Sequence, residues 1–390
     1  MTRLVKLSTF CETGSGGTPS RQNAERYFDG EIPWVKSGEL RGEVITKTKE
    51  KITNIALVES SAKLVPAGSI LLAMYGATVG RVAMLGINAA TSQAICAIRP
   101  DKSQAETSYV YHALRAKVPN FIAMAVGGAQ PNISQSMIRD TMIKLPSIEE
   151  QRLIANTLDK ANAISKKRQE SINLIDELLR SVFLDMFGDP VTNPKGWSRE
   201  QLCKLTSKIG SGATPRGGDS VYKSSGISFI RSLNVHDRLF LRKDLAYLDM
   251  QQAVKLSNVS VMAGDLLLNI TGASVARACL VPDHILPARV NQHVCIIRPI
   301  GQLIPEFLEA QMVCESVKKL LLGIGESMGA TRQAITKAQL ESFYVIVPPI
   351  SEQKRFTNIV AKIKEQKLRM QVFQTESELL FQSLQQQAFV

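Results

Sequence analysis

The chain has 390 residues and a formal net charge of +12, with 44% hydrophobic and 21% charged residues. This composition is typical of globular domains and excludes a disordered or fibrous chain, and the length favours two domains over one. No apolar run approaches the roughly 18 residues needed to span a bilayer, and Met1–Lys6 lacks the apolar core of a signal peptide. The sequence therefore predicts a cytoplasmic protein without membrane contact.

The cysteines and histidines do not form a metal-binding pattern. No C-x-x-C pair occurs, and no histidine stands at zinc-ligand spacing. We expect reduced thiols that mostly fill the cores, and no metal site. The residues concerned are Cys11, Cys96, Cys203, Cys279, Cys295, Cys314, His112, His236, His284 and His293. The excess of Lys and Arg favours a polyanionic partner and salt-dependent binding.

An internal repeat organises the chain, because five segments recur in the same order. The pairs are Gly14–Pro19 with Gly210–Pro215, Pro66–Leu72 with Met262–Leu268, Gly76–Arg81 with Gly272–Arg277, Gln93–Pro100 with Gln292–Pro299, and Leu145–Gln151 with Val347–Gln353. Their offsets grow from 196 to 202, which indicates a duplicated domain with small loop insertions.

Each repeat begins with a domain, at residues 1–148 and 189–350. Short aliphatic runs such as Ser69–Met74 and Ala94–Ile98 alternate with Gly, Pro and Asn, which predicts a mixed α+β domain with an irregular sheet and short helices. A long helix follows each domain, at residues 149–188 and 351–390. The segments Glu149–Phe187 and Ser351–Ala388 contain neither proline nor glycine and keep a helical period.

Steps of four and three residues along these helices trace the seams of a coiled coil, interrupted by polar positions that can fix the register. One seam comprises Ile154, Leu158, Ala161, Ser165, Arg168, Ile172, Ile175, Leu179, Val182 and Met186, and the other Phe356, Val360, Ile363, Lys367, Met370, Gln374, Ser377, Phe381 and Leu384. At 1.5 Å per residue, such a helix measures roughly 55 to 60 Å. Gly188 and Pro190 indicate where the first helix ends.

The order of the segments predicts the architecture. Each domain precedes its helix, so a second helix that packs along the first must run antiparallel to it. We therefore expect two tandem domains separated by long antiparallel coiled-coil helices, with pseudo-two-fold symmetry. Residues 149–188 carry six basic and seven acidic side chains and residues 351–390 carry six and four, which leaves +11 of the +12 charge on the two domains.

The sequence resembles the specificity subunits of type I restriction-modification systems over nearly its whole length. The resemblance rests on the duplication, on Gly76–Arg81 followed by Thr91–Cys96, on Leu145–Arg152 and on Phe183–Pro190. It implies that each repeated domain is a target recognition domain, reading one half of an interrupted, asymmetric double-stranded DNA site. It also implies that the helices are spacer regions that set the gap between the half-sites and dock two modification subunits.

The same resemblance implies where the chemistry lies. Modification subunits would bring S-adenosylmethionine and adenine methylation, and restriction subunits would bring ATP, Mg²⁺, translocation and cleavage, so this chain is expected to bind no cofactor itself. The sequence has no P-loop and no Asn-Pro-Pro-aromatic string. We expect a chain without catalytic activity of its own. The alternatives are a coiled-coil scaffold whose basic domains bind protein or RNA, and a self-contained enzyme.

The glycine-rich turns Gly14–Pro19 and Gly210–Pro215 have three interpretations. A phosphate-cradling nucleotide loop lacks its closing lysine and a helix directly behind it. A turn near the DNA backbone would place Thr18 and Arg21, or Thr214 and Arg216, on phosphates. A plain structural turn is the remaining interpretation.

The turns Gly76–Arg81 and Gly272–Arg277 repeat a small hydroxyl residue and an arginine at the same places. These candidate DNA-binding residues are Thr78 and Arg81 in the first repeat and Ser274 and Arg277 in the second. Glycine permits a close approach of backbone to phosphate, and arginine can bind phosphate or read guanine. The alternative is a sheet turn whose arginine caps a carboxylate.

Further candidates for DNA binding lie elsewhere in the repeats. Gln93 and Gln292 can pair with adenine or hold a loop. Lys36 and Arg231 follow the aromatic residues Trp34 and Phe229, which we expect in the core. The diverged stretches contribute Gln130, Arg332 and Gln333. The predicted spacer and docking residues are Ile154, Leu158, Ile172, Leu179, Val182, Phe356, Val360, Ile363, Met370 and Phe381.

Overall fold

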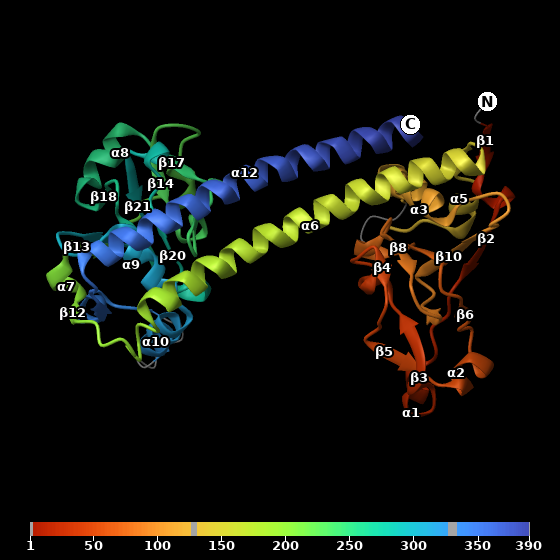
Figure 1. Ribbon diagram of the computed structural model, residues 1–390, viewed down its shortest axis with the longest axis horizontal. Helices are drawn as coiled ribbons and strands as arrows, with labels where there is room; N and C mark the ends of the chain where they lie inside the picture. Colours follow the sequence, from red (N-terminus) through yellow and green to blue (C-terminus); the bar gives the residue numbers. More distant parts are fainter. Residues whose placement is uncertain (1–2, 126–130, 327–333, 390) are drawn as a thin grey trace. The chain divides into compact units, whose positions relative to one another are not determined.

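The computed structural model describes residues 3–125, 131–326 and 334–389. The chain forms two compact units, residues 1–169 with 372–390 and residues 170–371. Each unit contains one of the repeated domains and part of both long helices, α6 (Ile148–Phe187) and α12 (Ile350–Phe389) (Figure 1). Within the described ranges, no helix is long and apolar enough to cross a membrane.

Unit 1 is built on two main sheets and a short strand pair. The five-stranded sheet has the order β2 (Cys11–Ser15), β10 (Ile95–Pro100), β7 (Ile70–Ala73), β8 (Val82–Leu85), β4 (Val44–Ile45). The four-stranded sheet has the order β5 (Glu50–Ile52), β3 (Phe28–Val35), β9 (Ala89–Thr91), β6 (Leu64–Val65), and β1 (Arg3–Lys6) pairs with β11 (Met142–Leu145).

Helices cover one face of the five-stranded sheet of unit 1. The helices before α6 are α1 (Ala24–Tyr27), α2 (Asn54–Glu59), α3 (Thr107–Ala116), α4 (Val118–Met124) and α5 (Gln135–Arg139). Tyr109 and Leu114 of α3 are fully buried in one core with Ile70 and Ile98 of the sheet. Phe389, near the end of α12, belongs to the same core, so the last helix contributes to the first domain.

Unit 2 repeats this plan. One four-stranded sheet has the order β13 (Thr206–Ser211), β22 (Val294–Pro299), β19 (Leu266–Asn269), β20 (Ala278–Leu280). The other has the order β17 (Ala246–Leu248), β14 (Ile227–Ile230), β21 (Ala288–Val290), β18 (Ser260–Val261). Two short pairs are β12 (Arg199–Gln201) with β23 (Tyr344–Ile346) and β15 (Val235–His236) with β16 (Leu239–Phe240).

The core of unit 2 is centred on four aromatic rings. Phe183 and Phe187 of α6 pack against Phe307 and Phe356, with ring centroids 4.9 to 6.3 Å apart. The helices of this unit, besides the two long ones, are α7 (Leu202–Leu205), α8 (Met250–Lys255), α9 (Pro305–Met312), α10 (Glu315–Glu326) and α11 (Lys337–Glu341). Both long helices are thereby anchored in the packing of this domain.

The two domains share the order of four strands in each main sheet, as their duplication predicts, and β4 adds a fifth strand in unit 1. β2, β10, β7 and β8 correspond to β13, β22, β19 and β20, and the second sheets correspond strand for strand. In each second sheet one neighbouring pair is parallel, β3 with β9 and β14 with β21. The predicted mixed α+β domains in tandem with long helices are therefore confirmed.

A buried glutamine secures the start of each long helix. Gln151 accepts a hydrogen bond from Glu106 N at 2.9 Å and donates to the carbonyl oxygens of Gln104 and Pro146, each at 3.0 Å. Gln353 makes the same three kinds of bond with Ile304, Gln302 and Pro348, at 2.8 to 2.9 Å. Both side chains are completely buried, so the repeated sequence at the start of each helix has a structural role.

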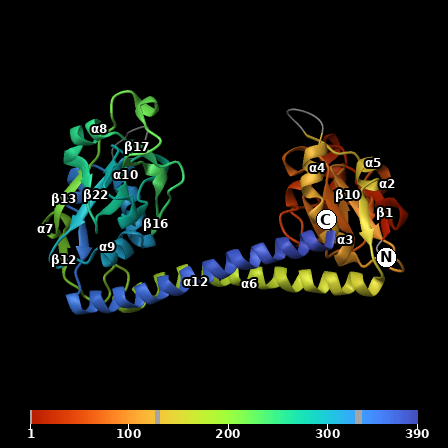
Figure 2. The same ribbon diagram turned by 90° about the horizontal axis from the view of Figure 1, so that it is seen from above.

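The long helices pack antiparallel within each unit, and the two views agree on this (Figures 1 and 2). In unit 1, Gln374 Nε2 donates to Ser165 Oγ at 2.9 Å, and Arg168 Nη1 donates to Phe373 O at 2.7 Å. In unit 2, Lys367 pairs with Asp176 at 2.6 Å. Polar positions of the predicted seams thus join the two helices and fix their register. Gly188, at φ +75°, follows the end of α6 as predicted.

Candidate nucleic-acid interface

Close backbone packing explains the glycines of the first turn. Gly16 N donates to Ile95 O at 3.1 Å, and a Cβ atom at Gly16 would overlap the carbonyl oxygen of Thr91. In unit 2, Gly212 N donates to Asn291 O at 3.1 Å, and a Cβ atom there would overlap Val290 O. The glycines therefore let the backbone pass close to the turn that leads into β10 in unit 1 and into β22 in unit 2. This favours the interpretation of the motif as a structural turn.

This close approach brings two predicted site residues together in each unit. Gln93 N donates to Thr18 Oγ1 at 3.4 Å, and both residues are exposed. In unit 2, Thr214 Oγ1 donates to the side-chain oxygen of Gln292, which is also exposed. Segments that lie far apart in the sequence thus form one threonine–glutamine pair at the surface of each domain.

The second shared turn lies between β7 and β8 in unit 1 and between β19 and β20 in unit 2. Gly76 and Gly272 adopt φ values of +65° and +73° and begin single 3-10 turns, Gly76–Thr78 and Gly272–Ser274. Thr78 Oγ1 donates to Tyr75 O at 2.9 Å. The turn therefore holds the hydroxyl residue close to the strand end from which it departs.

The arginines that end these turns, Arg81 and Arg277, pair with no carboxylate among the described residues. Arg81 is exposed, and Arg277 is half-buried with its Nη1 atom 3.4 Å from His236 Nδ1. The alternative interpretation, that these arginines cap a carboxylate, finds no support in residues 3–125, 131–326 and 334–389. Both guanidinium groups keep hydrogen-bond donors for an external anion or base.

A hollow of about 580 Å³ adjoins this turn in unit 2. Its lining includes Thr271, Ser274, Arg277 and His293. His293 Nδ1 lies 2.5 Å from Thr271 Oγ1, and its Nε2 atom lies 3.1 Å from the side-chain nitrogen of Gln292. Thr271 and His293 are not among the site residues predicted from the sequence. One feature of the sequence could have indicated them. Each of the two residues stands next to a segment shared by both repeats, yet differs from its counterpart in the first repeat.

Two further candidates of unit 1, Arg21 and Lys36, form a separate group around Glu50. Both cations pair with this carboxylate, and the hydrogen bond from Lys36, together with that from Arg21, lowers the pKa of Glu50. The Arg21 guanidinium lies 4.0 Å from the centroid of the Phe28 ring. Trp34 is buried, as expected. These two cations therefore have internal partners.

The remaining candidates of unit 2 are dispersed. Arg231 donates to Asp244 O at 2.6 Å and lies 5.3 Å from the Tyr222 ring, whereas Arg216 is exposed. Phe229 is buried, as expected. Gln130, Arg332 and Gln333 lie outside the described residues.

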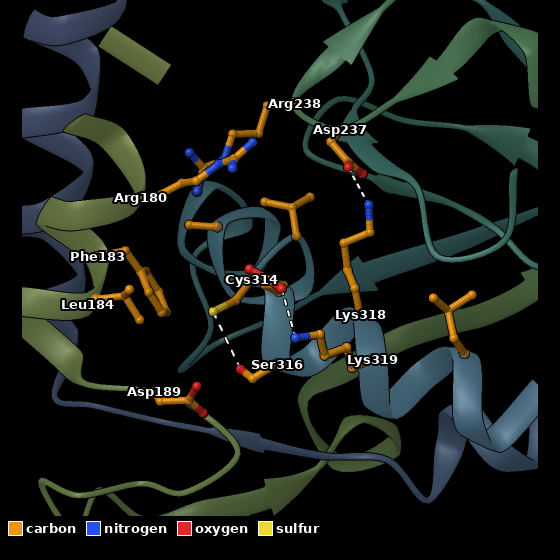
Figure 3. Close-up of a pocket in the computed structure, with 14 residues that line it drawn as sticks. Arg180, Phe183, Leu184, Asp189, Asp237, Arg238, Cys314, Ser316, Lys318 and Lys319 are labelled. Carbon is orange, nitrogen blue, oxygen red and sulfur yellow. Dashed lines mark hydrogen bonds and ion pairs between the residues drawn. The ribbon is translucent and has the colours of Figure 1, made fainter. Parts of the chain in front are cut away.

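A second hollow of unit 2, of about 620 Å³, lies beside α6 and α10 (Figure 3). Lys318 pairs with Asp237, and Lys319 pairs with Glu315 at 2.7 Å. Figure 3 shows the side chains of Arg180 and Arg238 reaching the same side of this hollow.

Arg238 is the more desolvated of these two arginines. Its burial, together with the charge of Arg180, lowers the pKa of its guanidinium, although the buried Glu309 opposes the shift. No sequence pattern indicates this hollow, because its cations come from α6, α10 and the turn between β15 and β16, which only the fold brings together.

The predicted spacer and docking residues face the interior of their units. In unit 1, Ile154, Leu158 and Phe381 pack on the domain core, and in unit 2 the same holds for Leu179, Val182, Phe356, Val360 and Ile363. Ile172 is buried and Met370 is half-buried. Other apolar side chains of the long helices are more than 40% exposed, namely Leu153, Ile164, Leu174, Leu178, Leu184, Ile350, Leu368, Val372, Phe373, Leu379 and Leu380.

Four of the six cysteines are buried in the domain cores. All six are free thiols, and burial raises the pKa of Cys11, Cys96, Cys279 and Cys295 to about 12. Among the described residues, no group of three or more His, Cys, Asp or Glu side chains is arranged to hold a metal ion.

Two regions of this chain match a known protein family. The family model for the type I restriction modification DNA specificity domain matches residues 3–174 and again residues 208–372. The type I restriction enzyme MjaIX specificity subunit of Methanocaldococcus jannaschii is 23% identical over 389 residues, covering 93% of this chain and 86% of that protein. The EcoR124I/EcoR124II specificity subunit of Escherichia coli is 27% identical over 176 residues, or 43% of each chain.

Solved structures show the same fold. A chain from a structural study of complex assembly and conformational transition of the type I R-M system aligns over 99% of this chain and 97% of its own length, with a TM-score of 0.65 and 20% identity. The S subunit of a type I restriction-modification system from M. genitalium aligns over 100% and 96%, with a TM-score of 0.58 and 12% identity. The chain therefore belongs to the family of DNA specificity subunits of type I restriction-modification systems.

Proposed function

We propose that this chain recognises a bipartite, asymmetric DNA site and positions two modification subunits on it, together with restriction subunits where the system has them. The observation that carries the proposal is the duplication of one surface. Each domain places a threonine beside the corresponding glutamine, Thr18 at the backbone N of Gln93 and Thr214 at the side chain of Gln292, on sheets that share the order of four strands. Two similar domains with different surrounding side chains suit two different half-sites.

Charge supports double-stranded DNA as the partner. Nearly all of the basic excess lies outside the two long helices, and Arg81, Arg216 and Arg277 have no ion pair with a carboxylate in the described part of the chain. Free cations on a basic domain attract phosphates and release counterions on binding. Contacts common to both domains suit the DNA backbone, which has the same chemistry at both half-sites.

The exposed faces of the long helices support docking of the modification subunits. Leu174 and Leu178 stand one turn apart on α6 and are 61% and 48% exposed. On α12, Val372, Phe373 and Leu380 are each more than 50% exposed. Exposed apolar side chains grouped along one element are typical of protein interfaces. The hollow beside Arg180 and Leu184 suits an acidic side chain of such a partner.

The chemistry would then reside in the partners. We propose that the modification subunits bind S-adenosylmethionine and methylate adenine, and that restriction subunits bind ATP and Mg²⁺. This chain would supply only the recognition of the DNA site and no catalytic group. The activity of the assembled methyltransferase or endonuclease would still depend on it.

Methylation mapping of the assembled complex tests this proposal. The chain is co-expressed with its modification subunits, and methylated adenines are sequenced across host DNA. We expect two short specified tracts separated by unspecified base pairs. A single continuous site would refute the bipartite arrangement, and methyl transfer by the isolated chain would refute a purely recognising role.

A further inference from the structure

The two domains carry different side chains at three positions where their backbones make identical contacts. Tyr75 and Thr271 each form an isolated antiparallel bridge, with Asn132 and Ala334 respectively. The residue before each of them bonds to the next strand, Met74 N to Ala94 O at 2.8 Å and Ile270 N to His293 O at 3.0 Å. Positions 75, 94 and 132 therefore correspond to positions 271, 293 and 334.

Each of these positions adjoins the shared candidate residues. Ala94 and His293 directly follow Gln93 and Gln292 in the chain, whereas Tyr75 and Thr271 precede the turns that end at Arg81 and Arg277. Variable side chains thus stand on a constant scaffold, among residues common to both domains. Shared residues cannot distinguish two half-sites, so the difference must come from neighbours such as these.

In unit 2, the side chains of Thr214, Gln292, His293 and Thr271 form a chain of hydrogen bonds in which each donor can be identified. Thr214 Oγ1 donates to the side-chain oxygen of Gln292, and the amide nitrogen of Gln292 can only donate, so it donates to His293 Nε2. His293 then carries its proton on Nδ1 and donates it to Thr271 Oγ1. The hydroxyl hydrogen of Thr271 remains available to the hollow, which Ser274 and Arg277 also line.

The surface of unit 1 is different in kind. Tyr75 is 45% exposed, and it occupies the place of the smaller Thr271. Ala94 stands where unit 2 has the imidazole of His293. The exposed Asn132 has an amide where unit 2 has only the methyl group of Ala334. A carboxamide can pair through two hydrogen bonds with adenine, whereas a set of donors matches the two acceptors of guanine in the major groove.

We propose that Tyr75 and Asn132 in the first domain, and Thr271 and His293 in the second, are residues that determine the two half-sites. The second domain takes a base edge with hydrogen-bond acceptors, as guanine offers, and the first takes adenine through Asn132 beside the Tyr75 ring. This inference rests on the proposed function, since it assigns the residues that make the two half-sites different.

Two double variants test the assignment in the complete complex with its modification subunits. The variants are Tyr75→Ala with Asn132→Ala, and Thr271→Val with His293→Ala. Methylated adenines are sequenced for each and compared with the unsubstituted complex. We expect each variant to lose the preference for at least one base by about tenfold, and the two variants to act on opposite half-sites. Unchanged half-sites, or changes in the same half-site, would overturn the inference.

Control variants separate this outcome from misfolding and from failure of the proposed function. Tyr344→Ala and His284→Ala alter an exposed tyrosine and an exposed histidine elsewhere in unit 2 and should leave both half-sites unchanged. If a double variant does not assemble, the single substitutions Asn132→Ala and Thr271→Val replace it, with a smaller change expected in the same half-site. Absence of a bipartite pattern with the unsubstituted chain would instead refute the proposed function.

Discussion

The side-chain nitrogen of Gln353 donates to the carbonyl oxygen of Gln302 at 2.8 Å, from a position that solvent does not reach. The same side chain also binds Ile304 N and Pro348 O. One residue therefore satisfies three backbone groups where α12 begins and where the chain approaches α9. Gln151 has this role at the start of α6.

We predict that Gln353→Ala lowers the free energy of unfolding of the chain by about 2 to 3 kcal/mol, because buried backbone groups lose their partners. Gln151→Ala should have a similar effect on unit 1. Urea denaturation followed by circular dichroism measures both. Gln366→Ala, at an exposed position of α12, is the control. A loss from Gln353→Ala no larger than that of this control would contradict the prediction.

The stability of unit 1 should decrease in mild acid because of His112. This side chain is fully buried, and burial lowers its pKa despite the bond between its Nε2 atom and Asp159 at 2.7 Å. Its Nδ1 atom has no hydrogen-bond partner among the described residues. The unfolded chain therefore binds a proton more readily than the folded chain, and stability falls as the pH decreases below about 6.5.

Urea midpoints measured at pH 7.5 and pH 5.5 test this effect. His112→Gln should reduce the loss of stability between the two pH values, while His284→Ala, at an exposed position, should leave it unchanged. An equal pH dependence for His112→Gln and the unsubstituted chain would show that another group is responsible.

Leu178 and Leu179 are neighbours in sequence with opposite environments, 48% and 4% exposed. Leu179→Asp should destabilise unit 2 by more than about 3 kcal/mol, because a charge would enter its core. Leu178→Asp should change the stability by less than about 0.5 kcal/mol, yet weaken association with the modification subunits. Thermal unfolding and co-purification distinguish the two effects. Normal assembly of Leu178→Asp would exclude this face of α6 as a docking site.

Arg81→Ala should weaken DNA binding by the complex without altering the fold, since Arg81 is exposed. If it contacts one phosphate, the slope of log K against log salt should become shallower by about 0.9, which is about an eightfold loss of affinity near 0.1 M salt. Arg277→Ala should act similarly at the other domain. Fluorescence anisotropy at several salt concentrations measures this slope. Lys63→Ala, an exposed cation outside the shared turns, is the control, and an unchanged slope for Arg81→Ala would remove it from the interface.

Sequence patterns predicted the domains and the long helices better than they predicted the contacts of the candidate DNA-binding residues. The repeat revealed two equivalent domains, and the helical period together with Gly188 revealed the extent of α6. By contrast, the ion pairs of Arg21 and Lys36 with Glu50 depend on the fold that brings these residues together. The same applies to His293, whose contact with Thr271 joins the segments beside the ends of β19 and β22. Local propensity carries no information about such pairings.

The assignment of residues 372–390 to unit 1 bears on how the protein is made. Phe389 is 4% exposed in a core whose other buried residues, such as Leu7 and Tyr109, are synthesised much earlier. A ribosome must therefore translate all of residues 170–371 before the first domain can complete its packing. Until then, the apolar surface that Phe389 and Phe381 cover in the folded domain remains exposed.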